Sequence, residues 1–271
     1  MAPFCIYSFL GLGIPTLAVI DLAFRNDANE LTISNLHAIT QGSFRTGFEN
    51  SILLAAITSI VPGILGLILA YAIQTSNTSI LRKLVATASG VLANFGGINL
   101  TFMFIATLGS TGALTVWLNA IGLNPWNHGF NLYSFFGVVI VYMYFQIPLM
   151  VLVITPALGG LRPSWREASE NLGASSFDYW RTVGIPVLLP SVLGAMLLLF
   201  GSAFAAYATA DTLTAGTVTL APIQIGAFLN GNVISGQENI GYAIGFGMLV
   251  VLTITMILYA LVRRRASRWL R

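Results

Sequence analysis

The chain has 271 residues, of which 56% are apolar and only 8% carry a charged side chain. Soluble domains carry roughly 25% charged residues, so a soluble protein of this composition could not cover its surface. An integral membrane protein is therefore the expected class. The net charge of +3 is small, and the placement of the basic residues along the chain is more informative than their sum.

Residues that build disulfides or metal sites are scarce. Cys5 is the only cysteine, so no disulfide can form within the chain. The two histidines, His37 and His128, have no cysteine cluster beside them. We expect neither a metal site nor a bound cofactor.

Six segments are apolar and long enough to cross a bilayer, which takes about 20 residues in a helix. They are residues 1–20, 51–73, 84–108, 133–158, 187–210 and 240–262. The first lacks the basic start of a signal peptide and is longer than a signal core. Pro62 and Gly63 predict a kink in the second. A short interfacial helix is expected at residues 114–123, between the third and fourth.

Basic residues gather on one side of this six-span arrangement. Polar segments 74–83 and 159–190 and the tail 263–271 hold ten of them, namely Arg82, Lys83, Arg162, Arg166, Arg181 and the arginines at 263, 264, 265, 268 and 271. The opposite loops hold only Arg25 and Arg45, which completes the twelve. Because cytoplasmic loops carry the excess of Lys and Arg, both termini and segment 159–190 are expected in the cytoplasm.

Polar side chains inside the expected spans are candidates for a solute path, because they are costly without partners or water. Asn94 and Asn99 lie in the third span and Gln146 in the fourth. Interhelical hydrogen bonding, worth about 0.6 kcal/mol on average, is the other interpretation, and the sequence leaves both open. Gln146 is favoured for a gate, because Pro148 frees a backbone carbonyl and bends the helix.

Two further candidates stand at the external end of the fifth span. They are Tyr207 and Asp211. Asp211 either meets a cationic solute or marks the water boundary. The boundary is favoured, because a charge at a helix end reaches water cheaply.

The polar segment 162–190 separates two charge-free apolar runs and is expected to form two short helices. Ser164 and Glu167, just after Pro163, have the Ser-x-x-Glu spacing of a capping box at the start of the first helix. Gly173 suits the left-handed stop at its end. Trp165 lies in the first turns of this helix.

The second helix should begin at Ser175 and Asp178, which repeat the capping spacing. It carries Phe177 and Trp180 on one side. Pro186 should end it, because the residue before a proline is pushed out of the helical region.

Two simpler interpretations of this helix pair exist. A DNA-binding helix-turn-helix also consists of two helices joined by a glycine turn. A helix pair that binds in a DNA groove should be clearly basic, however, and this segment has three arginines and three acidic residues. An amphipathic loop on the membrane surface is the other interpretation, because Trp165, Ala168 and Leu172 share one helix face. Nucleic-acid binding is not expected.

The order of residues in this segment resembles the EAA loop in permease subunits of binding-protein-dependent ABC importers. That pattern is Glu-Ala-Ala, three residues, Gly, nine residues, then Ile-x-Leu-Pro. The matching positions here are Glu167, Ala168, Ser169, Gly173, Val183, Gly184, Ile185 and Pro186. Ser for Ala, Val for Ile and Ile for Leu are conservative departures.

The resemblance implies an all-α integral membrane fold with six transmembrane helices and one permease domain over residues 1–271. Residues 159–190 would be a cytoplasmic coupling loop that sits in a groove of an ATPase subunit. The implied partners are two ATPase subunits, a second homologous permease and an external solute-binding protein in a bacterial cell membrane. The family often has a few more cytoplasmic residues before the first helix.

The chain itself carries no phosphate cradle of the Gly-x-x-x-x-Gly-Lys-Ser/Thr type, and Lys83 is its only lysine. No paired carboxylates or nucleophile–base set lies within a span. We therefore expect a non-catalytic subunit whose ATP hydrolysis comes from other chains.

For the solute, residues 200–216 resemble the polyamine, iron and aminoalkylphosphonate branch. The external acids Asp27, Glu30, Glu49, Asp211 and Glu238 outnumber two arginines and favour a polyamine such as spermidine or putrescine. Phosphonate, iron and sugar are the alternatives. A stand-alone secondary transporter is less favoured, because it would need buried ionisable residues for coupling. A purely structural membrane protein is the third option.

Overall fold

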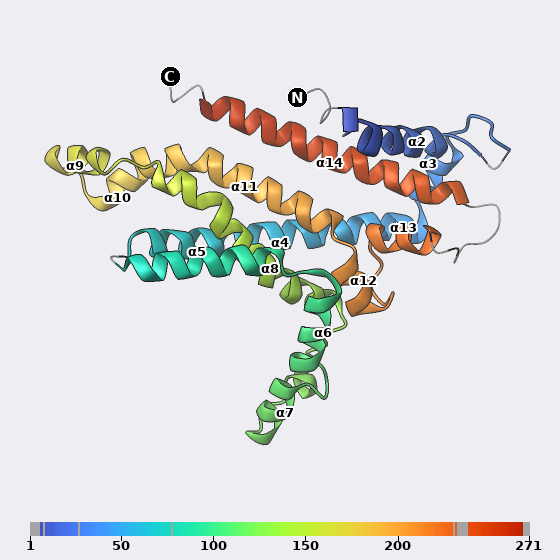
Figure 1. Cartoon of the computed structure of the whole chain (residues 1–271), viewed down its shortest axis with the longest axis horizontal. Coiled ribbons are helices and arrows are strands. Elements are labelled where there is room, and N and C mark those ends of the chain that lie inside the picture. Colours follow the sequence, from blue (N-terminus) through green and yellow to red (C-terminus); the bar gives the residue numbers. More distant parts are fainter. Residues whose placement is uncertain are drawn as a thin grey trace. The chain divides into compact units, whose positions relative to one another are not determined.

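The computed structural model describes residues 6–7, 9–26, 28–76, 78–229, 231 and 238–267 (Figure 1). Within these residues the secondary structure is helical, apart from one isolated β-bridge between Arg25 and Leu31. Contacts divide the chain into two compact units, Met1–Leu53 with Gly216–Ile254 and Leu54–Ala215 with Thr255–Arg271. Cys5, Asp27, Arg268 and Arg271 lie outside the described residues, as do the side chains of Glu238, Arg263 and Arg265.

The all-α integral membrane class is confirmed. In the part of the chain that the structure describes, five helical segments are long and apolar enough to cross a membrane, namely Gly42–Gln74, Gly97–Ala120, Phe135–Gly159, Ser176–Ala205 and Asn239–Val262. Phe9–Ala23 is a shorter apolar helix in the place of the first expected span. The second span begins earlier than expected, since residues 42–50 are already helical.

The first unit consists of η1 (Phe9–Gly13), α2 (Ile14–Ala23), α3 (Ser34–Ile39), the start of α4 (Gly42–Gln74), α13 (Ala221–Leu229) and much of α14 (Glu238–Ser267). Polar side chains of α4 fix the start of α13. Asn50 donates to the carbonyl of Thr219 at 3.0 Å, and Ser51 Oγ accepts from the amide of Ala221 at 2.9 Å. The second bond satisfies one of the free amides at that helix start.

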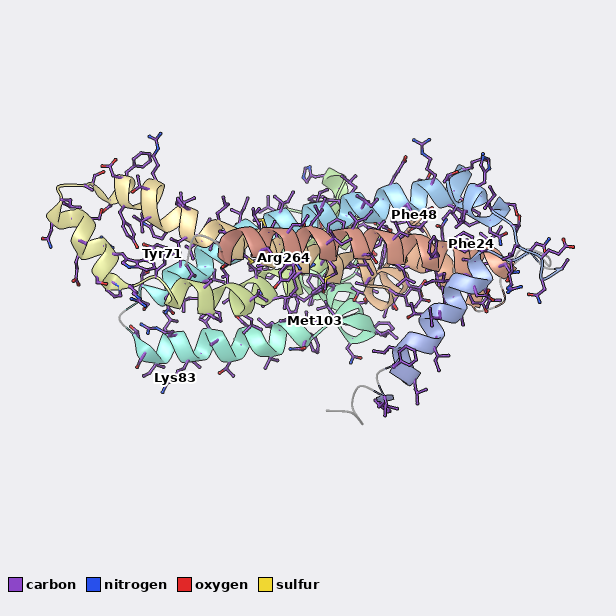
Figure 2. All side chains as sticks on the ribbon, turned by 90° about the horizontal axis from the view of Figure 1, so that it is seen from above. Phe24, Phe48, Tyr71, Lys83, Met103 and Arg264 are labelled. Carbon is purple, nitrogen blue, oxygen red and sulfur yellow. The ribbon has the colours of Figure 1, made fainter. Side chains whose placement is uncertain are left out.

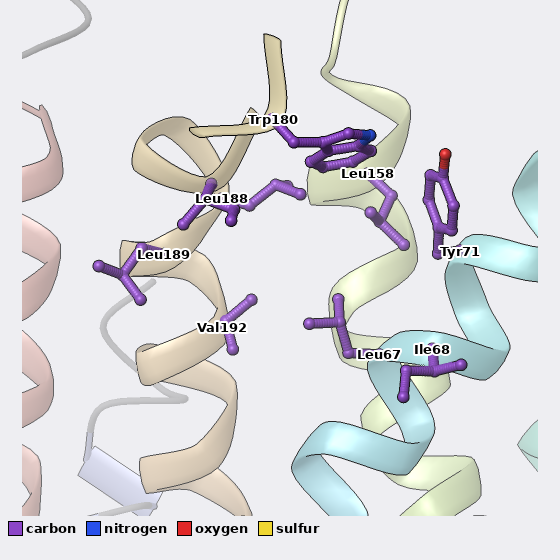
Figure 3. Close-up of a pocket in the computed structure, with 9 residues that line it drawn as sticks. Leu67, Ile68, Tyr71, Leu158, Trp180, Leu188, Leu189 and Val192 are labelled. Carbon is purple, nitrogen blue, oxygen red and sulfur yellow. The ribbon is translucent and has the colours of Figure 1, made fainter. Parts of the chain in front are cut away.

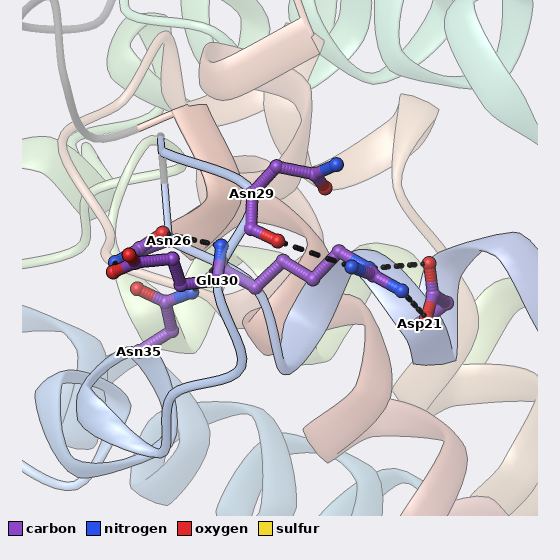
Figure 4. Close-up of polar contacts among 6 residues, drawn as sticks. Asp21, Asn26, Asn29, Glu30 and Asn35 are labelled. Carbon is purple, nitrogen blue, oxygen red and sulfur yellow. Dashed lines mark hydrogen bonds and ion pairs between the residues drawn. The ribbon is translucent and has the colours of Figure 1, made fainter.

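Both arginines of the expected external loops are held by neighbouring acids in this unit. Arg25 Nε donates to Asp21 at 2.8 Å, and its Nη1 donates to the carbonyl of Asn29 at 3.1 Å (Figure 4). Arg45 Nε donates to Glu49 at 2.7 Å. Each arginine therefore has its charge balanced by a carboxylate four residues away.

The second unit holds the rest of α4, then α5 (Ser79–Asn94), α6 (Gly97–Leu108), α7 (Ala113–Ala120), η2 (Pro125–His128), α8 (Phe135–Gly159), α9 (Pro163–Asn171), α10 (Ser176–Tyr179), η3 (Trp180–Gly184), α11 (Ile185–Ala205) and α12 (Ala208–Thr214). Its apolar core includes Ala70 of α4, Met150 and Ile154 of α8, and Leu199 of α11. The helix expected at residues 114–123 is present as α7.

Glycine lets α4 approach its neighbours closely in this core. A β-carbon at Gly66 would lie 2.6 Å from Met150 Cβ and 2.9 Å from the carbonyl oxygen of Ile147. A β-carbon at Gly63 would meet Met196 at 2.8 Å. Small residues at such crossings are typical of helix packing in membranes. Pro62 lies inside α4 without ending it, and the kink expected there stays a prediction.

The third expected span, residues 84–108, is wrong as a continuous helix. It is divided into α5 and α6 at Phe95 and Gly96, and α6 leaves the direction of α5 (Figure 1). Gly96 is extended, with φ −136°, and Gly97 has φ +73°. Glycine adopts the second conformation without the steric cost that other residues meet. The 16 residues of α5 cover about 24 Å, less than the thickness of a bilayer core.

The fifth expected span, residues 187–210, is also interrupted. The helix α11 ends at Ala205, and α12 begins at Ala208. Apolarity alone predicted one continuous helix in both places, because a hydropathy pattern does not report where backbone hydrogen bonding stops.

Candidate functional site

Residues 159–190 keep the name coupling loop for the role predicted from the sequence. The first helix of this segment is α9, and its start differs from the expected capping box. Arg162 is the N-cap residue, Pro163 occupies the first turn, and no side chain caps the helix. Ser164 and Glu167 therefore lie inside α9, and the box predicted from them is wrong. Proline at the first helical position has no amide to satisfy and a φ that is already helical, so it moves the helix start ahead of Ser164.

The end of α9 agrees with the sequence prediction. Gly173 has φ +80°. Its amide donates to the carbonyl of Glu170 at 2.9 Å, and the amide of Ala174 donates to that of Ser169 at 3.1 Å. These two bonds are the pattern of a Schellman motif, which needs a left-handed residue at this position.

The second helix, α10, begins with the predicted capping box. The amide of Asp178 donates to Ser175 Oγ at 3.2 Å, and Asp178 accepts from the amide of Ser175 at 3.0 Å. Two amides at the helix start are thereby satisfied by side chains. The direction in which α10 leaves the glycine turn is fixed locally.

Pro186 does not end the second helix, contrary to expectation. The chain passes from α10 through the π-turn η3 into α11, and Pro186 lies in the first turn of α11. Proline lacks an amide and crowds the carbonyl four residues earlier, which is that of Thr182. This carbonyl lies within η3, and π-bulges accommodate such interruptions. The coupling loop is thus joined to a spanning helix without a break.

The coupling loop exposes apolar side chains beside a free carboxylate. Leu172 is 87% exposed and Phe177 70%, whereas Ile185, which is 54% exposed, already belongs to α11. Glu167 and Ala168 are exposed as well. Arg166 is bonded to Glu170 at 2.9 Å, whereas no ion pair is found for Glu167 among the described residues. Apolar groups around an acid form a surface suited to a protein partner.

Two other residues predicted to contact the ATPase are less exposed. Trp165 is half-buried, with the guanidinium of Arg162 6.0 Å from its ring centre. Val183 is also half-buried, within η3. Trp180, in the same turn, packs edge-on against Tyr71 of α4 at 5.2 Å. The loop is therefore anchored to the second unit through η3.

Of the polar candidates in the spans, only Gln146 is buried. Its Nε2 donates to the carbonyl of Leu199 on α11 at 2.9 Å, and its Oε1 has no partner within the described structure. Asn94 is exposed and donates to the carbonyl of Gly90 on its own helix. Asn99 is exposed. The structure does not bring these three side chains together.

The two helix interruptions meet through Thr209, which sequence reasoning missed. Thr209 is 4% exposed, and its Oγ1 accepts from the amide of Gly97 at 2.9 Å. Thr101 Oγ1 donates to the carbonyl of Thr209 at 3.2 Å. Tyr142 OH donates to the carbonyl of Ala206 at 2.9 Å. The glycine pair at 96–97 was the only sign in the sequence of this joint.

Tyr207 and Asp211 lie directly after the interruption of α11. Tyr207 OH donates to Asp211 at 3.0 Å. The buried face of α12 is formed by Thr209, Ala210 and Leu213, so Asp211 lies on the opposite face. No basic side chain is paired with Asp211 within the described residues.

No group of three or more metal-ligating side chains is found in the described part of the chain. A comparison with protein families is more informative. The model of the binding-protein-dependent transport system inner membrane component matches residues 64–268. The chain belongs to this family. The match includes the coupling loop and both interrupted helices.

Individual relatives of this inner membrane component transport different solutes. A spermidine/putrescine transport system permease homologue from Mycoplasma genitalium is 25% identical over 77% of this chain and 66% of its own length. A putative ferric transport system permease from Haemophilus influenzae is 26% identical over 71% of this chain and 30% of its own. A sulfate transport system permease from Escherichia coli is 24% identical over 60% and 56%. The chain thus spans less than two thirds of the length of these relatives.

The fold is similar to that of a chain in a solved bacterial ABC transporter involved in the import of the acidic polysaccharide alginate. The TM-score is 0.72 over 98% of this chain and 93% of that chain, at 16% identity. A chain of a bacterial alginate ABC transporter solved in complex with an alginate pentasaccharide-bound periplasmic protein is similar as well, with a TM-score of 0.73 over 97% of this chain and 92% of that chain, at 17% identity. At this identity the likeness concerns the fold.

Proposed function

We propose that this inner membrane component is the non-catalytic permease subunit of an ATP-driven importer. In the assembly it pairs with a second homologous permease, two ATPase subunits and an external solute-binding protein. The observation that carries the proposal is the coupling loop, in which a Schellman turn at Gly173 and a capping box at Ser175 present Glu167, Leu172 and Phe177 outward. The continuous path from α10 into α11 then links an ATPase contact to a spanning helix.

The membrane orientation belongs to the same proposal. The coupling loop, both termini and the basic tail 263–271 lie in the cytoplasm, as the distribution of Lys and Arg favours. Lys83 points away from the ribbon near the start of α5, the end of that helix assigned to the cytoplasm (Figure 2). The segment with Arg25 and the start of α4 with Arg45 then face the solute-binding protein.

The contact with the ATPase is tested by Glu167→Ala. Glu167 is exposed and has no ion pair among the described residues, so the substitution should spare the fold. We expect the ATPase to co-purify at several-fold lower yield, since a charge contact at an interface contributes about 1 kcal/mol or more. Ser164→Ala, an exposed change on the same helix, is the control. Equal ATPase yields from both variants would show that Glu167 does not contribute to the contact.

For the solute, we propose a cation of the polyamine class. The relatives named above include polyamine, iron and sulfate transporters, so the choice depends on this chain's own charges. Arg25 and Arg45 are neutralised by Asp21 and Glu49, while Asp211 has only Tyr207 as a described partner. An unpaired carboxylate beside an interrupted spanning helix favours a cation over sulfate or an acidic sugar.

The solute is tested with the assembled transporter in vesicles. Uptake of putrescine, spermidine, ferric ion, sulfate, a phosphonate and a disaccharide is compared in the wild type and in Asp211→Asn. We expect polyamine uptake, with a KM that rises about tenfold or more in the variant, as for the loss of about 1.4 kcal/mol of charge attraction. Glu30→Gln is the control for general surface charge. If only sulfate or only the disaccharide is taken up, the proposal of a cationic solute is rejected.

A further inference from the structure

A cavity of about 350 Å³ lies beside the coupling loop, within the second unit (Figure 3). Leu188, Leu189 and Val192 of α11 form one wall, and Ile68 and Tyr71 of α4 form the other. Trp180 of η3 closes one end. All of these side chains are apolar or aromatic, and the size falls within the roughly 300–1,000 Å³ of ordinary ligand sites.

The cavity is open to the outside of the chain. Ile68 is 60% exposed, Ile185 54% and Leu189 47%, and all three line the cavity. These helices cross the membrane, and an apolar opening at membrane depth meets hydrocarbon rather than water. The walls offer an acyl chain the same apolar contacts that it has in the bilayer.

The turn η3, which closes the cavity through Trp180, also contains an arginine. Arg181 follows Trp180 in η3, is exposed, and has no ion pair within the described structure. Arg166 is bonded to Glu170 at 2.9 Å, so its charge is already balanced by a carboxylate. Basic residues next to spanning helices on the cytoplasmic side attract anionic lipid headgroups. An apolar groove closed by Trp180, with this arginine as the next residue of the same turn, suits a phospholipid with one negative charge.

We propose that this cavity binds one acyl chain of an anionic phospholipid, whose phosphate is held by Arg181. The proposal rests on the cytoplasmic placement of the coupling loop. The lipid would contact Trp180, which packs on Tyr71 at 5.2 Å and belongs to the turn between α10 and α11. Lipid binding therefore supports the turn through which the ATPase contact reaches the spanning helix.

The test measures retained lipid directly, on the assembled transporter in mild detergent, by native mass spectrometry. Phosphatidylglycerol and phosphatidylcholine with identical acyl chains are the probes. The wild type should retain about five times as much phosphatidylglycerol as phosphatidylcholine, because one basic residue near an anionic headgroup contributes about 1 kcal/mol. Arg181→Gln should abolish the preference, and Lys83→Gln, another exposed cytoplasmic cation, should keep it.

A second pair of variants tests the cavity. Leu189→Trp places an indole at the mouth and should prevent retention of either lipid, whereas Leu193→Trp, on the same helix outside the cavity, should not. Ile68→Trp replaces Leu189→Trp if that variant does not assemble. Equal retention in the cavity and control variants would overturn the proposal. Crosslinking of the Leu189→Cys variant to the second permease would also overturn the proposal, because it would show that protein, and not lipid, covers the mouth of the cavity. If the wild type retains phosphatidylglycerol but shows no ATP-driven uptake, the proposed function is rejected while the lipid site stands.

Discussion

At the scale of the residue, Gly173 is required for its backbone conformation alone. Its φ is +80°, and a β-carbon at this position would meet no atom within 4 Å. A side chain would therefore not collide with the fold, and its cost would be conformational. That cost is about 1–2 kcal/mol for a residue forced into the left-handed region, and it is smaller for asparagine, which adopts this region more readily than most residues.

We predict that Gly173→Val opens the Schellman turn and turns α10 away from α9. ATPase co-purification and ATP-driven uptake should both fall several-fold, because about 1–2 kcal/mol of strain is relieved when the turn opens. Gly173→Asn is the matched control and should retain most of both. Insertion in the membrane should be unchanged. Wild-type transport by Gly173→Val would mean that the loop is only a surface segment.

The contrast between Gly173 and Gln146 shows what the sequence could reveal at this scale. The glycine stop and the capping box at Ser175 are local motifs, so their spacing alone predicted them correctly. Gln146 is different, because its partner is the carbonyl of Leu199, 53 residues away. No local pattern specifies that contact. The sequence left two interpretations open, and the geometry supports interhelical bonding.

At the scale of the element, the spans were predicted by apolarity and the interruptions were not. A run of about 20 apolar residues indicates a segment that crosses the bilayer, but it does not indicate a continuous helix. Inside a membrane, freed backbone groups need protein partners. Here Thr209 supplies one to the amide of Gly97 at the start of α6, Thr101 supplies one to the carbonyl of Thr209 in α12, and Tyr142 supplies one to the carbonyl of Ala206 after α11. Such pairing depends on tertiary contacts between residues more than 60 positions apart.

We predict that Thr209→Val weakens the joint between α6 and α12. Valine has nearly the shape of threonine but cannot accept the hydrogen bond from the amide of Gly97. A buried donor left without its partner costs about 1–3 kcal/mol, so the purified assembly should lose part of its thermal stability. Thr212→Val, on the less buried face of α12, is the control. Equal melting temperatures for the two variants would show that the joint is held by packing.

At the scale of the whole molecule, the family match and the charge distribution support different conclusions. The match to residues 64–268 establishes the family, whereas relatives at 24–26% identity transport different solutes. Solute choice changes with a few side chains on a common scaffold, which is why fold does not determine it. The proposed orientation, in contrast, is argued from where the basic residues lie. It can be tested without knowing the solute.

We predict that Ser110 and Ser164 lie on opposite sides of the membrane. Both side chains are exposed. Ser110 belongs to a loop without basic residues, and Ser164 lies between Arg162 and Arg166 in the coupling loop. Single cysteines are placed at each position after Cys5→Ser removes the native thiol, and intact cells are treated with a membrane-impermeant maleimide. The cysteine at 110 should react at once, and the cysteine at 164 only after the membrane is permeabilised. Because the wild-type ATPase contact could shield position 164, the permeabilised reaction is repeated on the permease expressed without its ATPase. Labelling of position 164 in intact cells would place the coupling loop outside the cell. A cytoplasmic ATPase could not reach it there, and the proposed importer could not work.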